Sequence, residues 1–200
     1  MAELEPAGDD RLAPRRRPRP GFLLLGVTLA AVLAVGLFTT MGNGAGTTLP
    51  KAGGAMPSFS LPRVGGSGTA GVPVDGGGEG HPAVVLFLAS WCTPCQAEIP
   101  ALATARRRQV AGHQRLAKVD LIGVDGNDPT PNALAFLHES GVTFPVGADR
   151  TYAVTSGTFG FSALPEAVMV DADGTIAAIH YGALSTADLV RWQQRLLSSP

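Results

Sequence analysis

Cysteine is scarce in this sequence, with only Cys92 and Cys95 among 200 residues. Two cysteines this close in the chain cannot staple distant segments, which excludes a small secreted domain held by a disulfide framework. Charge of one sign is also lacking, since the formal net charge is -1. Without a basic stripe beyond the N-terminal tail, nucleic acid is not an expected partner. We therefore expect the two cysteines to serve chemistry.

Clusters of metal ligands are lacking as well. A structural zinc site would need about two further Cys or His ligands at suitable spacing from the cysteine pair. The histidines instead stand singly along the chain, at His81, His113, His138 and His180. The sequence therefore predicts no metal and no other cofactor beyond the cysteines themselves.

One long apolar run is present near the N-terminus. Residues 22–41 carry no charge and, as a helix rising about 1.5 Å per residue, would extend about 30 Å, enough to span a bilayer. Arginines cluster before this run, and no Lys or Arg follows it until Lys51, which favours a cytoplasmic N-terminus. We expect a basic cytoplasmic tail (1–20), a transmembrane anchor (21–41, meeting the lipid bilayer through 22–41), a flexible linker (42–55) and an extracytoplasmic domain of the cell membrane (56–200).

Other export signals fit this segment less well. A cleaved signal peptide has the same order of basic and apolar parts but a shorter apolar core of about 7 to 15 residues, and cleavage remains an open alternative. The arginines match a twin-arginine signal poorly because proline interrupts them. A lipoprotein anchor is excluded, since no cysteine closely follows the apolar run.

Residues 56–200 show the periodicity of an α/β domain. Apolar runs bounded by turn residues predict strands, and apolar stripes behind capping residues predict helices. A strand, helix, strand order favours parallel pairing, whereas the tight Asp173-Gly174 turn favours an antiparallel hairpin. The Gly-rich stretch 65–80 is interpreted as a surface loop. The expected elements are strands 83–89, 119–124, 144–146, 167–170 and 175–180, and helices 93–110, 130–141 and one beginning after Ser185.

The cysteines lie at the predicted junction of the first buried strand and the first helix. This places Cys92 beside unpaired backbone N–H groups and the positive end of the helix dipole, which favour a thiolate. Cys95, one turn farther along, would resolve a mixed disulfide. The competing interpretation is a pair of inert buried thiols, or a disulfide that only closes a turn.

The segment SWCTPCQAEIP resembles the active site of the TlpA/ResA/DsbE-like thiol-disulfide oxidoreductases. PSFSLP near residue 57, DPTPNALAFLHESGVTFPV and GFSALPEAVMVDADGTI are similar to that family in the same order. The resemblance implies a thioredoxin-like fold, with a central mixed sheet flanked by helices and an inserted helix and strand. The Gly-rich stretch departs from the family, so the first hairpin is expected to be short or irregular.

The resemblance also implies roles for individual residues. Pro165 matches the family's cis-proline, with Leu164 offering its backbone to an extended substrate. Glu98 matches a glutamate that tunes the thiols, and Pro100 a proline that kinks the helix. Trp91, Thr93 and Pro94 complete the expected substrate-contacting surface. The alternatives are a trans Pro165, a solvated first-turn Glu98 and a Trp91 in the core, while Arg106, Arg107 and Arg108 are interpreted as a solvated helix face.

These features predict two-electron exchange with thiols or disulfides of exported proteins through Cys92. The family's common role is reduction, for example of apocytochrome c, with electrons from a membrane partner; the oxidising direction stays open. A thiol peroxidase is a second candidate, although Ala89, Ser90 and Trp91 stand where peroxidases need Pro and Thr. A copper chaperone is a third, with His180 as the conceivable third ligand.

Overall fold

The computed structural model describes residues 49–66, 71–74 and 80–199. None of the helices in these ranges combines the length and apolar character needed to cross a membrane. The predicted membrane anchor at 21–41 and the basic tail before it lie outside the described residues.

A five-stranded mixed sheet forms the centre of the domain, in the order β5-β4-β3-β6-β7. The first three strands pair in parallel, and β6 and β7 join antiparallel beside β3. β3 is buried along its whole length, as its continuous apolar sequence predicts. The α/β class and the mixed sheet are therefore confirmed. The strands are β3 (Ala83–Leu88), β4 (Asp120–Gly126), β5 (Val146–Asp149), β6 (Glu166–Val170) and β7 (Ile176–Tyr181).

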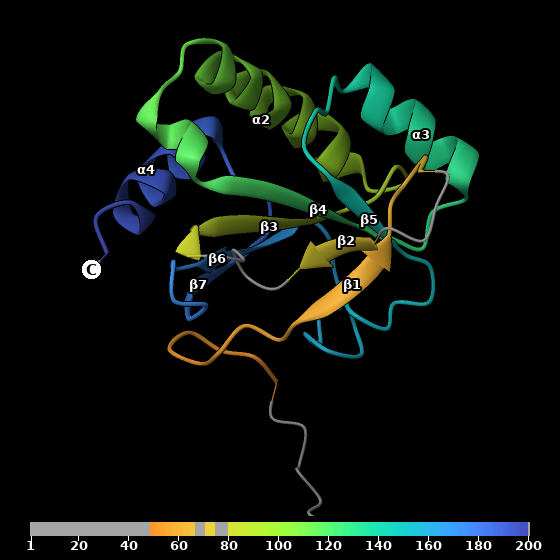
Figure 1. The fold of residues 1–200 in the computed structure, drawn as a ribbon. Coiled ribbons are helices and arrows are strands. Elements are labelled where there is room, and N and C mark those ends of the chain that lie inside the picture. Colours follow the sequence, from red (N-terminus) through yellow and green to blue (C-terminus); the bar gives the residue numbers. More distant parts are fainter. Residues whose placement is uncertain (1–48, 67–70, 75–79, 200) are drawn as a thin grey trace, which may run out of the picture. The chain divides into compact units, whose positions relative to one another are not determined.

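Three helices cover one face of this sheet (Figure 1). They are α2 (Thr93–Ala111), α3 (Thr130–Glu139) and α4 (Thr186–Leu196), with a short 3-10 helix, η2 (Arg115–Lys118), after α2. Alternate residues of the strands face them and form one apolar core with Ile99 and Leu102 of α2 and Leu189 of α4. All three helices were predicted, and the bounds of α2 and α3 and the start of α4 agree to within two residues.

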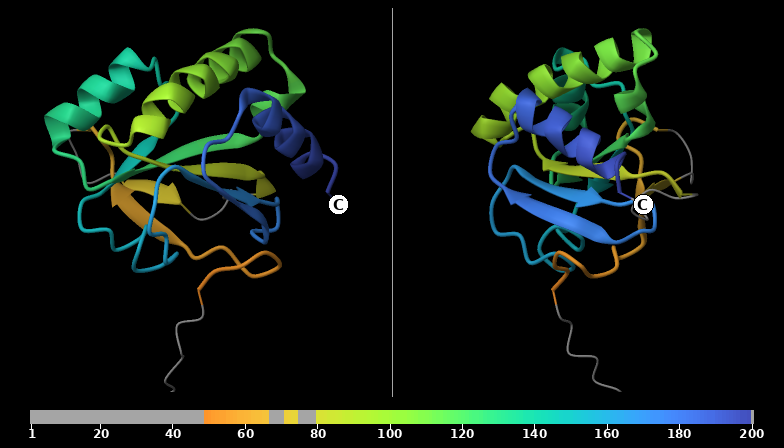
Figure 2. Two further views of the ribbon diagram at one scale, coloured as in Figure 1. Left: turned by 180° about the vertical axis from the view of Figure 1, so that it is seen from behind. Right: turned by 90° about the vertical axis from the view of Figure 1, so that its left-hand side faces the viewer.

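The opposite face of the sheet is covered without a regular helix among the described residues (Figure 2). Residues 151–159 form successive turns there. Phe159 from this turn segment and Phe161 just after it pack edge-on against Phe87 of β3, with ring centroids 5.1 and 4.9 Å away. This second apolar core also takes in Met56 and Leu61 from the N-terminal part of the domain.

The N-terminal part of the domain differs from the sequence prediction. β1 (Phe59–Pro62) pairs antiparallel with β2 (Gly71–Val74), so the Gly-rich stretch contains a strand where a loop was predicted. Both strands are short, as the departure from the family implied. The backbone N–H of Gly53 donates to the Ile176 carbonyl at 2.8 Å, and Ala55 forms a bridge with Thr175. The folded unit thus begins before Met56, where the linker was expected.

Two further predictions need correction. β5 runs from Val146 to Asp149, whereas a strand over 144–146 was predicted, because buried Asp149 continues the strand. The arginines of α2 were interpreted as a solvated face. Arg107 and Arg108 are exposed, as interpreted, whereas Arg106 donates to the Ala117 and Val119 carbonyls at 3.0 and 2.9 Å and ties α2 to the chain that leads into β4.

Candidate functional site

The cysteine pair stands where β3 passes into α2. Cys92 and Cys95 are joined by a disulfide and are 4% and 0% exposed. Cys92 is the N-cap of α2, and its Sγ accepts the Cys95 backbone N–H at 3.2 Å. A thiolate at Cys92 would accept the same N–H and lie at the positive end of the helix dipole, so this position favours the charged nucleophile.

Glu98 lies one turn beyond Cys95 on α2 and is buried, at 8% exposure. The interpretation of Glu98 as a solvated first-turn acid is therefore wrong. Burial raises the pKa of this carboxyl to about 7, although a hydrogen bond from the backbone of Leu184 opposes the shift. Its Oε2 has no hydrogen-bond partner among the described residues. A carboxyl with such a pKa can take up or release a proton near neutral pH.

Trp91 precedes the pair and is 52% exposed, so it is not a core residue. Its indole N–H donates to the Gly126 carbonyl at 3.1 Å, which fixes the ring beside the end of β4. Trp91 and Leu164 line a common cavity of about 290 Å³ next to the cysteine edge of the sheet. The other residues lining it are Tyr152, Thr155, Ser156, Phe161, Ser162 and Ala163.

The remaining predicted site residues divide between surface and interior. The Leu164–Pro165 peptide bond is cis, so the trans alternative is wrong, and Pro165 itself is buried. Thr93 and Pro94 are exposed on the first turn of α2. The structure thus brings Trp91 and Leu164 to one cavity, with Thr93 and Pro94 exposed in the first turn after Cys92.

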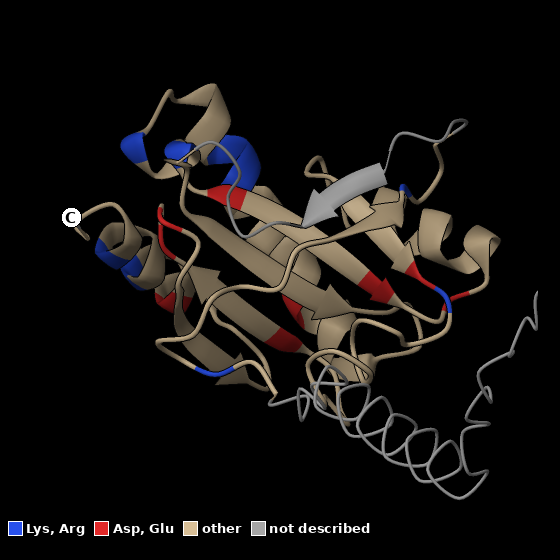
Figure 3. Cartoon of the chain, turned by 60° about the horizontal axis from the view of Figure 1, so that its bottom comes forward, with Lys and Arg blue, Asp and Glu red and all other residues tan. Residues whose placement is uncertain are grey.

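Two buried acids near the cysteine edge were not predicted. Glu166 directly follows Pro165 at the start of β6, and burial raises its pKa to about 7, opposed by His180. Asp125 lies near the end of β4, and burial, with Asp128 nearby, raises its pKa to about 8. Figure 3 shows acidic residues within the strands, whereas Lys and Arg lie mainly on helices and loops. An acid inside an apolar strand pattern was the signal available in the sequence.

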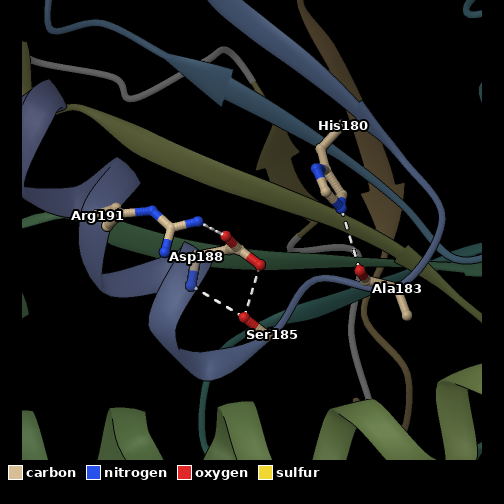
Figure 4. Close-up of polar contacts among 5 residues, drawn as sticks. All are labelled: His180, Ala183, Ser185, Asp188 and Arg191. Atoms are coloured by element: carbon tan, nitrogen blue, oxygen red, sulfur yellow. Dashed lines mark hydrogen bonds and ion pairs between the residues drawn. The ribbon is translucent and has the colours of Figure 1, made fainter.

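Within the part of the chain that is described, no three His, Cys, Asp or Glu side chains are arranged to hold a metal ion. His180, the third copper ligand considered above, lies on β7, and its Nε2 is 3.1 Å from the Ala183 carbonyl (Figure 4). The cysteine pair itself forms a disulfide site, with Cys92 and Cys95 joined through their sulfurs.

Comparison with known proteins agrees with this geometry. Residues 51–191 match the family model described as Redoxin. The chain belongs to the Redoxin family. The thiol:disulfide interchange protein DsbE homolog of Paracoccus denitrificans is 35% identical over 105 residues, which cover 52% of this chain and 53% of that protein. The thiol-disulfide oxidoreductase ResA of Halalkalibacterium halodurans is 25% identical over 107 residues, covering 54% and 57%.

Solved structures support the fold of this Redoxin-family chain. A thioredoxin family thiol:disulfide interchange protein from Chlorobium tepidum superposes with a TM-score of 0.58 at 24% identity, covering 75% of this chain and 99% of the other. The thioredoxin-like fold is thereby confirmed. The resemblance to ResA and DsbE is confirmed by the matching family model and the relatives of those names. The chain spans about half the length of the curated relatives named above.

Proposed function

We propose that this Redoxin-family protein is a thiol-disulfide oxidoreductase that exchanges two electrons with cysteines of exported proteins. The observation that carries the proposal is the Cys92–Cys95 disulfide, with Cys92 capping α2. An inert disulfide that only closes a turn would need neither the N-terminal position in a helix nor the hydrogen bond from the Cys95 N–H to Sγ of Cys92.

In the reducing direction, the Cys92 thiolate attacks a substrate disulfide, and the substrate's first sulfur leaves as a thiolate. A mixed disulfide then joins Cys92 to the substrate. The Cys95 thiolate attacks Sγ of Cys92, closes the Cys92–Cys95 disulfide and releases the second substrate thiolate. Two electrons have passed to the substrate, and an external dithiol must restore the pair. The oxidising direction is the same sequence reversed.

Glu98 is proposed to serve the second step. Cys95 is fully buried and must lose its proton before it can attack Cys92. The Glu98 carboxyl lies one turn farther along the same helix, and burial raises its pKa to about 7. Its ionised form can accept the Cys95 proton near neutral pH, and its protonated form can return it in the opposite direction.

Substrate is proposed to lie across the exposed residues around the pair. Trp91 and Leu164 offer an apolar surface at the adjacent cavity, with Thr93 and Pro94 exposed on the other side of Cys92. The backbone at Leu164, held before the cis Pro165, would pair with an extended substrate segment.

The direction, compartment and partners are further parts of the proposal. We favour reduction of exported thiol proteins, apocytochrome c among them, by a domain that residues 22–41 hold at the outer face of the cell membrane. A membrane protein would supply the electrons. The likeness to proteins named DsbE and ResA supports this assignment, as does the uncharged run 22–41 behind a basic cluster.

Trapping of the mixed disulfide tests the exchange. Cys95→Ser should accumulate a covalent adduct with a disulfide-containing peptide, and a reductant should release it. Cys92→Ser is the matched control and should form no adduct, since Cys95 is inaccessible. Equal adducts from both variants, or none from either, would reject Cys92 as the attacking residue.

The reduction potential of the pair tests the direction separately. Equilibration with glutathione or a dithiol gives the ratio of reduced to oxidised protein at known potentials. A potential as low as thioredoxin's, about -270 mV, supports the reductase, whereas one near that of DsbA, about -120 mV, supports the oxidase.

A further inference from the structure

The loop that enters Cys92 is fastened to the neighbouring strand by one carboxyl group. Asp128, just beyond the end of β4, accepts the Ser90 backbone N–H at 2.6 Å and the Ser90 hydroxyl at 2.7 Å. Trp91 adds a third bond, to the Gly126 carbonyl. Ser90 and Trp91 immediately precede Cys92, so these contacts with the end of β4 set where its sulfur lies.

The fastening carboxyl has an unusual neighbour. Asp125 is 2% exposed, and its carboxyl is within hydrogen-bond reach of the Asp128 carboxyl. Two neighbouring carboxyl groups can hydrogen-bond to each other only if one of them carries a proton, because ionised carboxylates accept but do not donate. Oδ1 of Asp125 has no partner among the described residues.

The other charged groups around Asp125 do not stabilise its ionised form in place of that proton. Asp149 adds a further negative charge, and its Oδ2 is occupied by the backbone N–H groups of Val154 and Thr155 and by the Thr155 hydroxyl. Arg150 is the nearby cation. Its guanidinium donates to the Asp128 carbonyl at 3.4 Å and to the Thr130 hydroxyl at 2.6 Å, and not to the Asp125 carboxyl.

We propose that the protonated Asp125 carboxyl donates to Asp128 and that the two act as a positioning pair, which holds Ser90, and with it the Cys92 loop, against the end of β4. Loss of that proton to solvent leaves two buried carboxylates side by side. Their repulsion moves Asp128 away and weakens its bonds to Ser90. Burial and the neighbouring carboxylates raise the Asp125 pKa to about 8, so the release occurs in mildly alkaline solution.

The consequence for catalysis rests on the exchange role proposed for Cys92, but the pair itself can be tested without exchange. Trp91 is bonded to Gly126 beside Asp125, so its fluorescence reports on the fastening. In a Trp192→Phe background, and with the disulfide intact so that no thiol titrates, Trp91 emission should change between pH 6 and 9.5 with a midpoint near pH 8.

Two variants test whether that fluorescence transition comes from the Asp125–Asp128 pair. Asp125→Asn should abolish it, because an amide donates to Asp128 at every pH. Asp128→Asn should abolish it as well, because residue 128 then carries no charge for an ionised Asp125 to repel. Asp120→Asn, at the partly exposed start of β4, is the matched control and should keep the wild-type transition.

Exchange rates complete the test. The Cys92-dependent exchange rate of the wild type, divided by that of Asp125→Asn, should be at least twofold smaller above pH 8 than at pH 6. A fluorescence transition that survives in Asp125→Asn, or that is missing in the wild type, would overturn the proposal. Because the titration uses oxidised protein, its result stands whether or not the adduct experiment supports Cys92 as the nucleophile.

Discussion

Gln109 of α2 and Gln193 of α4 exchange two amide hydrogen bonds, of 2.8 and 3.1 Å, across 84 positions of sequence. Both side chains are buried, at 3% and 0% exposure. Gln193 also donates to the Leu116 carbonyl in η2 at 3.3 Å. This reciprocal pair fixes α4 against the far end of α2, the helix that Cys92 caps.

Breaking one side of the glutamine pair should cost more than replacing both sides. Gln109→Leu leaves the Gln193 amide buried without its partner, and we expect a loss of about 1 to 3 kcal/mol in the free energy of unfolding. The double variant Gln109→Leu/Gln193→Leu should lose less than either single variant. Urea unfolding of all four proteins measures the coupling; additive losses would show that the two amides do not depend on each other.

The cap of α4 is a second measurable contact. The Asp188 backbone N–H donates to Oγ of Ser185 at 3.1 Å, and the Asp188 carboxylate also contacts Arg191 (Figure 4). Ser185→Ala should destabilise the domain by about 1 kcal/mol in thermal or urea unfolding. Ser185→Asn can still accept this N–H and should recover most of the loss. Equal losses in both variants would argue against capping as the cause.

Ionisation of Glu98 should determine how the exchange rate depends on pH. If it accepts the Cys95 proton, the rate constant of the wild type rises as pH passes through about 7, where Glu98 ionises. Glu98→Gln should lose this inflection and exchange roughly a hundredfold more slowly at pH 7.5, at the low end of the range of general base catalysis. Stopped-flow measurement against a peptide disulfide gives both profiles. Glu139→Gln, an exposed acid, is the control; identical profiles for Glu98→Gln and wild type would make Glu98 structural.

Glu166 should lower stability as pH rises. Burial raises its pKa from 4.5 to about 7, so the folded protein holds this proton more tightly than the unfolded chain does. The unfolding free energy therefore falls as pH increases from about 4.5 to about 7, by about 3 kcal/mol if about 1.4 kcal/mol accompanies each pKa unit. Glu166→Gln cannot ionise and should be more stable than the wild type at pH 8, but not at pH 4.

Urea midpoints at pH 4 and pH 8 for the wild type, Glu166→Gln and Glu139→Gln check this sign. The exposed Glu139 should show no comparable difference between the two pH values. A Glu166→Gln variant that loses stability at pH 8 would mean that the carboxylate is held by contacts stronger than its burial penalty.

The elements predicted well are those whose signal is local. The apolar run of β3, the Asp173-Gly174 turn and the Ser185 cap each depend on a few neighbouring residues. The position of Cys92 as the cap of α2 follows from the same local order of strand and helix.

The elements missed depend on distant contacts. Asp149 ends β5 in the interior because Val154 and Thr155 satisfy its carboxylate, which a strand pattern cannot reveal. The strand Gly71–Val74 forms because β1 supplies a partner. Burial of Asp125 and Glu166 likewise comes from the packing of other elements, so their altered acidity could not be derived from periodicity.

The bridge between Ala55 and Thr175 has a mechanical consequence. β6 runs antiparallel to β3, so its start at Glu166 lies beside the cysteine edge and the turn after Val170 lies at the opposite pole of the sheet. Ala55 docks next to that turn. A pull on the chain at Gly53 therefore enters the domain at the pole remote from Cys92, away from the reactive sulfurs.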